Sequence, residues 1–569
     1  GGITIKATDA PIIDSTAYAA SAAASLSFFG SLTISGAGAE ALNVILTKTR
    51  AYATASDLRS AGDITIEASD TSTISAVVKT VAAGFSVGYY AGAVSIGTGT
   101  AHNYVGRDDQ AAEVLAYLSS SSARANAGQI WLTAAESAAI TADVQADGNS
   151  LSVGLIAVAA SGAGVVLENQ VNALVRAAVS NTRNSGVQAS SGVTISAQDT
   201  SKITANAKAA TFAAAVGVGA AVSVSASRAS NTIASTVDAH ATSASITTTS
   251  GNLSIDAAES ATIETSSVAS AQSAGLGVTL SGGGASATAS ITTTTHGYAD
   301  PVALDIAGDI RIRARDSAIA VTTATGHATA ISLIAVSGAF TTATSTVKPD
   351  VAALLAGYTT GDTTATADGD IAVLGILAAS STATAKAGSF STGLNSAGAS
   401  AAATITAKSG TQPSVKAAIT GGTVVSTGGS ISVVGSYNAD SSGTVANGSG
   451  ANASAQASSG GVLYGDSGSS ATATEQPTMQ VCVDTGVALR ARQAVQLVGA
   501  SVTSAVAAAG GKDGGFIGLG RSTSSATGSG STSVTFGGSL GTLGQRGATL
   551  LTVTASSVDD ARATSQAVS

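Results

Sequence analysis

The sequence predicts an all-β protein built by stacking repeats, a β-solenoid for which a right-handed parallel β-helix is the favoured form. Three observations support this fold class. A seven-residue phrase returns about every 61 residues, as expected for a repeat architecture. Only 10% of residues are charged and 3% aromatic, with 66 glycines, which favours flat sheets facing one another across a thin core. No segment shows a sustained apolar pattern at helical spacing.

The repeated phrase begins at Gly1 as Gly-Gly-Ile-Thr-Ile-Lys-Ala and returns at Gly62 as Gly-Asp-Ile-Thr-Ile-Glu-Ala. The small residues that close its copies are Ala7, Ala68, Ala134, Ala197, Ala257, Ala314, Gly375, Gly435, Gly499 and Ala555. These positions predict about nine repeats, which we divide into two segments. Residues 1–345 carry an acidic corner in each repeat, and residues 346–569 continue as divergent repeats rich in Ser and Gly.

One repeat, residues 192–252, contains about five expected strands. Residues 193–197 and 203–207 alternate apolar and polar side chains, which is typical of a strand with one buried face. A Gly/Ala-rich run at 212–224 follows, and it suggests a close approach between backbones. Because a narrow solenoid takes roughly 20–30 residues per coil, we expect two to three coils per repeat. At about 4.8 Å per strand, each repeat would rise roughly 10–14 Å, and nine repeats would form a rod of roughly 90–130 Å.

Two sets of polar or rigid residues recur at expected corners before the phrase. The early repeats have Asn43, Asn103, Asn172 and Asn231, and the later ones have Pro349, Pro413 and Pro477. Asn tolerates a left-handed backbone and Pro fixes φ, so both suit a turn. A ladder of stacked Asn side chains is the alternative. Turns are preferred, because whole coils would separate one Asn from the next.

An acid stands two residues after the end of the phrase in six successive copies. These acids are Asp9, Asp70, Glu136, Asp199, Glu259 and Asp316. Aligned carboxylates suggest calcium, but its ligands must converge at about 2.3–2.6 Å from one ion. Acids separated by one repeat of roughly 10–14 Å cannot do so. We therefore interpret them as corner acids that accept turn hydrogen bonds, and we expect no metal and no cofactor.

Composition bears on several function classes. The net charge of −9 and the lack of Lys/Arg clusters argue against nucleic-acid binding. No apolar run of about 20 residues is present, so no membrane span is expected. Cys482 is the only cysteine, the four histidines have no metal-binding spacing, and no motif predicts a catalytic residue. The chain begins within the repeated phrase and ends shortly after another copy, so we expect it to be part of a longer protein.

The phrase Gly-Asp-Ile-Thr-Ile-x-Ala and the Val-Gly-Val-Gly-Ala-Ala-Val run at residues 216–222 resemble the repeats of giant bacterial surface proteins of the adhesin and haemagglutinin type. The resemblance implies an extracellular or cell-surface location. It also implies a non-enzymatic role as a segment of a fibre, filament or adhesin stalk. Further copies of the chain, other cells or surface glycans would be its partners. Two alternatives remain: a polysaccharide-binding or -cleaving β-helix similar to a tail fibre, and an ice-binding surface built from Thr runs such as residues 291–295.

Overall fold

The computed structural model describes residues 1–568 except 184–185, 358–362, 411, 440–448 and 542–546. The described residues form strands and turns and contain no helix, so the all-β prediction is confirmed. None of them belongs to a helix with the length and apolarity needed to cross a membrane. The strands are β1 (Ile3–Asp9), β2 (Ile12–Leu26), β3 (Gly30–Ile45), β4 (Lys48–Thr54), β5 (Asp57–Ser60), β6 (Ile64–Asp70), β7 (Thr73–Val87), β8 (Tyr90–Val105), β9 (Ala112–Ser119), β10 (Ser122–Ala125), β11 (Gln129–Glu136), β12 (Ala139–Ser180), β13 (Val187–Ala189), β14 (Gly192–Thr242), β15 (Ala244–Thr248), β16 (Asn252–Gly275), β17 (Val278–Ile306), β18 (Ile310–Ile331), β19 (Ile334–Lys348), β20 (Val351–Gly357), β21 (Thr363–Ala367), β22 (Ile371–Ser391), β23 (Leu394–Thr406), β24 (Val415–Thr420), β25 (Thr423–Ser426), β26 (Ile431–Tyr437), β27 (Gly450–Gly461), β28 (Tyr464–Gln476), β29 (Thr478–Val483), β30 (Ala488–Ala491), β31 (Ala494–Gly514), β32 (Ile517–Gly528), β33 (Ser531–Phe536), β34 (Ser539–Leu540) and β35 (Leu550–Val568).

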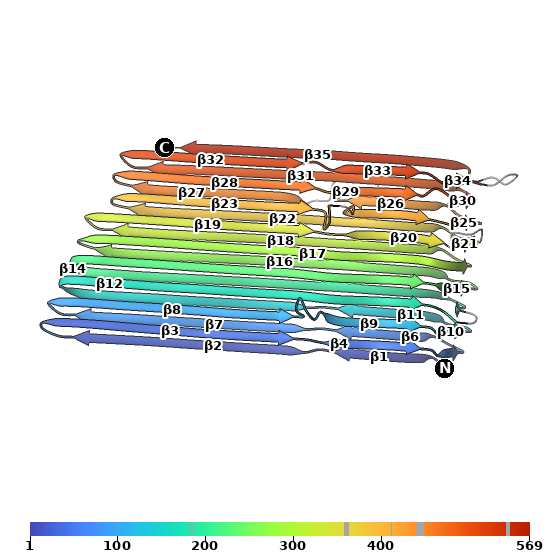
Figure 1. Cartoon of the computed structure of the whole chain (residues 1–569), viewed down its shortest axis with the longest axis horizontal. Helices are drawn as coiled ribbons and strands as arrows, with labels where there is room; N and C mark the ends of the chain where they lie inside the picture. The colour runs from blue at the N-terminus through green and yellow to red at the C-terminus, as the bar shows by residue number, and fades with distance from the viewer. Residues whose placement is uncertain (184–185, 358–362, 411, 440–448, 542–546, 569) are drawn as a thin grey trace.

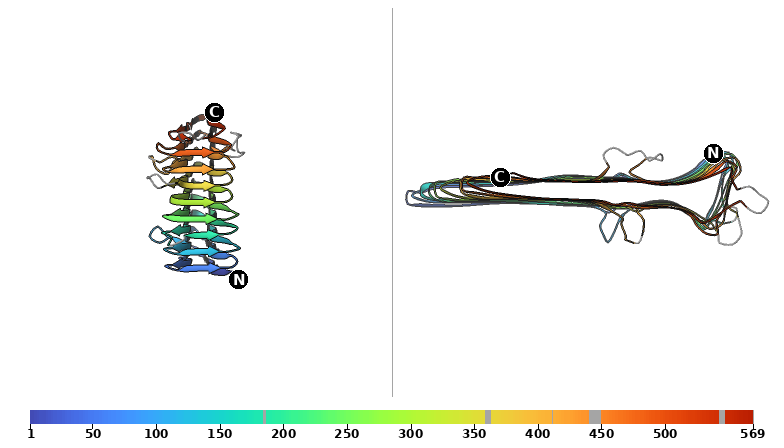
Figure 2. Two further views of the ribbon diagram at one scale, coloured as in Figure 1. Left: turned by 90° about the vertical axis from the view of Figure 1, so that its right-hand side faces the viewer. Right: turned by 90° about the horizontal axis from the view of Figure 1, so that it is seen from above.

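Each circuit of the chain follows a flattened outline, which Figure 2 shows from above. We call the two long sides the first wall and the second wall. In the first circuit, β1 and β2 form the first wall, β3 and β4 form the second wall, and β5 forms a short side at the wide end. The opposite end narrows to a turn between the walls. Nine such narrow turns lie in the described residues, near 28–29, 88–89, 154–155, 216–218, 276–277, 332–333, 392–393, 462–463 and 515–516.

Successive circuits pair in parallel (Figure 1). Most pairings keep one register, and shifts occur at 153–156, 299–302 and 363–365. Ile3 of β1 pairs with Ile64 of β6, and Ile64 pairs with Ile130 of β11. The stacked rings of Tyr52 and Tyr117, which are register partners in β4 and β9, have centroids 4.8 Å apart. One repeat is therefore one circuit and adds one strand layer. The expectation of two to three coils per repeat is wrong, because this circuit is much wider than that of a narrow solenoid.

The interior changes in composition from the wide end to the narrow end. At the wide end, large aliphatic side chains such as Ile66, Leu132 and Ile195 are fully buried between the walls. Towards the narrow turns, Ala, Ser and Gly replace them, as in the small buried cluster that includes Ala157, Ala213 and Ala221. This taper explains the Gly/Ala-rich runs, because only small side chains fit where the two walls approach each other.

Glycines at the narrow end mark contacts between backbones of opposite walls. A Cβ atom on Gly148 would lie 2.3 Å from the carbonyl oxygen of Gly162 across the interior. One on Gly97 would lie 2.7 Å from the carbonyl oxygen of Asp147. These distances are too short for any side chain, so the close approach that the sequence suggested is present in the structure.

The two sequence segments form one stack without a structural break between them. Strand β19 runs from Ile334 to Lys348 and so crosses the boundary between residues 345 and 346. It pairs with β17 on one side and β23 on the other along most of its length. The divergence after residue 345 therefore changes side chains while the strand pairing continues.

Candidate functional site

The six acids occupy register-matched positions in consecutive strands of the first wall, where they form what we call the acid column. Asp9 pairs with Asp70, Glu136 pairs with both Asp70 and Asp199, and Glu259 pairs with both Asp199 and Asp316. Register partners in parallel strands lie about 4.8 Å apart. The expected separation of roughly 10–14 Å is therefore wrong, since it was based on several coils per repeat.

Burial of the column follows from the alternation of the strands. Asp70 has the same parity as Ile64, Ile66 and Ala68, so its side chain points into the core with theirs. Asp70, Glu136, Asp199, Glu259 and Asp316 are all at most 4% exposed, whereas Asp9 is exposed. The interpretation as corner acids that accept turn hydrogen bonds fits Asp70 and Asp199, which accept from the serines two residues further on, but it did not include the burial of five of the six acids. Screening by salt, which weakens repulsion between exposed charges, is much weaker at this depth.

The aspartates in the column accept hydrogen bonds from hydroxyl groups. Ser72 donates to Asp70 over 3.1 Å, and Ser201 donates to Asp199 over 2.8 Å. Asp316 accepts a hydrogen bond from Thr293, which lies on the second wall and points inward. Because donors stabilise an ionised carboxylate, they partly offset the effect of burial. Burial nevertheless dominates, and it raises the pKa of Asp316 to about 7.

The two glutamates in the column lack such donors. Neither side-chain oxygen of Glu136 or of Glu259 has a hydrogen-bond partner. Burial, together with the charges of the neighbouring aspartates, raises the pKa of both glutamates well above its usual range. A protonated glutamate would be a donor to the aspartate in the next layer. The column from Asp70 to Asp316 therefore alternates between carboxyl groups that have hydroxyl donors and carboxyl groups suited to carrying a proton.

A second buried acid shows the contrasting arrangement. Glu475 in β28 is fully buried and accepts a hydrogen bond from the Tyr437 hydroxyl over 2.7 Å. Asn438 and the backbone amides of Ala451 and Ser504 also donate to it. Tyr437 pairs with Leu377, the residue that follows Asp316 in the register of the acid column. Sequence reasoning missed this cluster, because its members are far apart in the chain and Glu475 is not part of a repeated phrase.

The described residues contain no group of three or more His, Cys, Asp or Glu side chains arranged to hold a metal ion. Neighbouring carboxyl groups in the acid column are one layer apart, so each has at most one acid on either side. The chemistry that this arrangement offers is therefore storage and sharing of protons within a low-dielectric interior.

The asparagines form a buried ladder on the second wall, so their interpretation as turn residues is wrong. Asn43 donates to Asn103 over 2.7 Å, Asn103 donates to Asn169 over 2.7 Å, and Asn169 donates to Asn231 over 2.6 Å. The third member is Asn169, because Asn172 faces outward and donates to the backbone oxygen of Arg107. One circuit per repeat brings successive Asn side chains within hydrogen-bonding distance.

The three prolines lie at a different place from the asparagines. Pro349 lies between β19 and β20, Pro413 precedes β24, and Pro477 lies between β28 and β29. All three therefore stand where the second wall is interrupted. Proline has no backbone N–H and cannot donate to a neighbouring strand. It fits these positions because no ladder hydrogen bond is required where the strand is interrupted.

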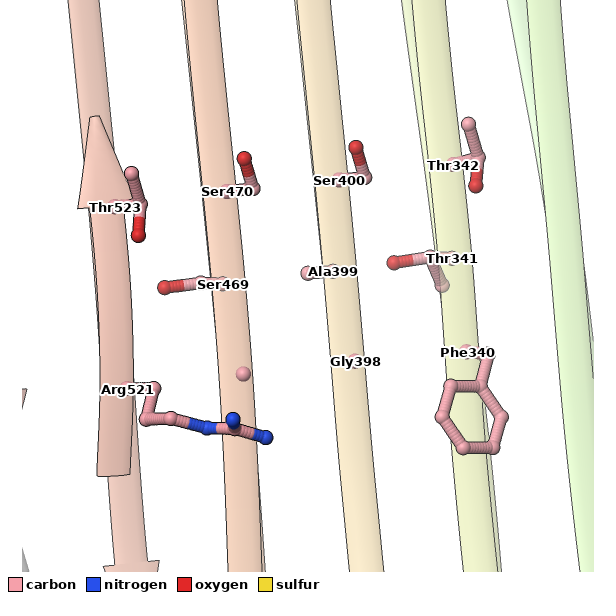
Figure 3. A pocket seen from close by; sticks show the side chains of 11 residues that line it. Phe340, Thr341, Thr342, Gly398, Ala399, Ser400, Ser469, Ser470, Arg521 and Thr523 are labelled. Carbon is pink, nitrogen blue, oxygen red and sulfur yellow. The ribbon is translucent and has the colours of Figure 1, made fainter. Parts of the chain in front are cut away.

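The outer face of the second wall carries a shallow groove of about 460 Å³ (Figure 3). Gly398 lies between the Phe340 ring and the Arg521 side chain (Figure 3), and Gly468 also lines the groove. Ser and Thr side chains complete the lining, and none of the lining residues is acidic. The groove thus offers an aromatic face, a cation and hydroxyl groups, but it lacks the acids that glycoside cleavage requires.

The Thr runs do not form flat exposed arrays. In the run at residues 291–295, Thr293 and Thr295 point inward and are fully buried, whereas Thr292 and Thr294 face outward. Strand alternation divides each run between the two faces of a wall.

Comparison with known proteins finds no matching family model, curated protein or solved structure.

Proposed function

We propose that this chain is a non-enzymatic structural segment of an extracellular bacterial fibre or adhesin stalk, built as a β-solenoid. The observation that carries the proposal is the parallel pairing of successive circuits, unshifted in these strands of the first wall, in which every repeat adds one strand layer to the same stack. Such a stack satisfies its backbone hydrogen bonds layer by layer and buries a continuous core. Its regular outer walls suit a spacer that projects or joins surfaces.

The side chains of the interior support the same role. The Asn ladder and five of the six acids of the acid column are buried, so most of their polar groups face the interior of the stack. The surface groove holds no acid. The extracellular location is proposed from the resemblance of the repeated phrase to bacterial surface proteins and from the near absence of cysteine.

Polysaccharide binding is a second candidate, favoured by the groove between Phe340 and Arg521. An aromatic face beside hydroxyl groups is suited to a sugar ring, and its geometry supports binding without cleavage. The variant Arg521→Ala tests this candidate, with Arg562→Ala as a control for removing an exposed cation elsewhere.

One experiment separates the structural role from an enzymatic one. The purified chain is imaged by electron microscopy and is also incubated with a panel of bacterial polysaccharides. We expect uniform layered particles and no release of reducing ends. Release of reducing ends that is lost in Arg521→Ala but kept in Arg562→Ala would overturn the non-enzymatic proposal. Irregular particles with a helical far-UV spectrum would overturn the solenoid.

A further inference from the structure

Eight of the nine narrow turns expose large apolar side chains, and the seventh, Thr392-Gly393, lies between the exposed Phe390 and Leu394. Phe28 and Phe29 occupy the first turn, Tyr89 the second, Leu333 the sixth and Phe516 the ninth, and each is about half exposed or more. We call the exposed apolar residues of the nine narrow turns the apolar ridge. The turns lie above one another along the narrow edge (Figure 1), so the ridge follows this edge of the described molecule.

The ridge concentrates the residues that a protein of this composition would be expected to bury. The chain has eight phenylalanines, and seven of them are exposed. All seven lie in the narrow turns or on the strands that adjoin them. The interior beside them consists of Ala, Ser and Gly, so the taper leaves no room for these rings inside. Large side chains stand at this edge although they cannot contribute to the core.

The exposed area is large enough for a stable interface. An aromatic side chain offers about 150–250 Å² when it is fully covered. The ridge and its adjoining phenylalanines therefore present on the order of 1,000 Å², against about 300–600 Å² for the largest apolar patch on a typical monomer. A standard interface covers about 800 Å² on each partner, so the ridge meets that requirement.

The spacing of the ridge is fixed by the stacking of the turns. A Cβ on Gly154 would lie 2.2 Å from the carbonyl oxygen of Gly88 in the preceding turn, and one on Gly217 would lie 1.8 Å from that of Gly154. These glycines let each turn lie directly on the one before, about 4.8 Å away. A rigid surface with this period is matched by another surface with the same period, which a second copy of the chain provides.

The charges near the ridge disfavour an anionic membrane as its occupant. The nine turns contain no charged residue, and the chain carries a net charge of −9. Helices and edges that bind anionic lipid usually have Lys and Arg beside their apolar residues. On the first wall beside the turns, Phe85, Leu151 and Phe212 line an apolar hollow of about 510 Å³ together with small residues. This hollow lies on β2, β7, β12 and β14, which lead into the first four narrow turns, and it can receive apolar side chains from another copy.

We propose that the apolar ridge is an interface between copies of this chain, in which the turns of one copy pack against the ridge and the adjoining hollow of another. The biological role of this contact, lateral association of stalks, rests on the proposed function. The surface itself is defined by the exposed residues alone.

Sedimentation equilibrium of the purified chain over a range of concentrations tests the proposal. The ridge variant is Phe29→Ser, Leu333→Ser and Phe516→Ser together. The matched control is Leu42→Ser, Val166→Ser and Ile319→Ser, three exposed apolar residues on the walls. We expect the wild type and the control to associate, and the ridge variant to weaken association at least tenfold. Far-UV spectra check that each variant remains folded.

Cross-linking gives a readout that does not depend on affinity. A short bis-maleimide should join two copies through Leu333→Cys, but not through Ile319→Cys. A wild type that stays monomeric throughout, or a ridge variant that associates as strongly as the control, would overturn the interface. So would ridge-dependent flotation of a monomeric wild type with phosphatidylcholine vesicles, which would make lipid the occupant. Intact layered particles with no association would reject the interface and leave the stalk proposal standing.

Discussion

At the scale of single residues, the interior of this molecule is organised by columns of identical or similar side chains. A polar side chain repeated once per circuit meets its own copy in the next layer. For Asn, which has both a donor and an acceptor, the result is a continuous hydrogen-bonded ladder. Asp and Glu have only acceptors when ionised, so carboxylates in neighbouring layers repel each other. Protonation of some of them removes this repulsion.

The glutamates of the acid column should make stability depend on pH. Their pKa values are raised in the folded protein, so their contribution is fully present below about pH 4 and is lost as the pH rises towards the folded pKa. Glu136→Gln with Glu259→Gln removes this penalty. At pH 8 the double variant should be more stable than the wild type by roughly 1–3 kcal/mol. At pH 4 the two should be equal.

Urea unfolding at both pH values measures this difference. The control is Glu264→Gln, an exposed glutamate near Lys202, which should change little at either pH. An equal shift of the double variant at pH 4 and pH 8 would mean that the glutamates are not held as protonated groups.

The Asn ladder should be costly to interrupt. Asn103→Ala removes a donor and an acceptor: the Asn43 amide keeps its hydrogen bond to Ser15 but loses the one to Asn103, and the oxygen of Asn169 loses its donor. We expect a loss of about 2–5 kcal/mol, since each unpaired buried group costs about 1–3 kcal/mol. Asn206→Ala, at an exposed position of β14, is the control and should stay within about 0.5 kcal/mol. Similar unfolding midpoints for the two variants would contradict a structural role for the ladder.

At the scale of elements, the sequence predicts the strands better than their arrangement. The alternation at residues 193–197 predicts a strand, and these residues lie in β14. The length of a circuit depends on where the chain returns to itself, which no local pattern contains. The prediction of two to three coils per repeat therefore used the circuit length of narrower solenoids. For the same reason the predicted separation of the acids was too large and the Asn ladder was set aside in favour of turns. The alternation of side chains along a strand did contain one usable signal. Asp70 lies an even number of residues from Ile64 and Ile66, and Asn43 lies an even number from Ala41 and Ile45. Both side chains could therefore be predicted to face inward with these apolar residues.

The tapered end gives a prediction about element packing. Gly148→Ala places a Cβ where the carbonyl oxygen of Gly162 lies 2.3 Å away, so the walls must separate. We expect a loss of about 1–3 kcal/mol, the usual cost of overpacking. Gly468→Ala is the matched control, because a Cβ there meets no atom within 4 Å. Equal stability of the two variants in urea would show that the walls are not in close contact.

At the scale of the whole molecule, the central claim is that each repeat of about 61 residues adds one strand layer. Lys79 and Lys386 are exposed on the first wall and belong to one register column, which runs through Gln145, Lys208, Val268 and Thr325. Five layer steps therefore separate the two lysines. At about 4.8 Å per step their backbones should be about 24 Å apart. With two to three coils per repeat, the separation would be roughly 48–72 Å.

The most direct test is the distance between spin labels on Lys79→Cys and Lys386→Cys, measured by pulsed electron paramagnetic resonance in a Cys482→Ser background. One layer per repeat predicts a narrow distribution near 24 Å, broadened by the label linkers. A distribution centred near 50 Å or beyond would contradict the account.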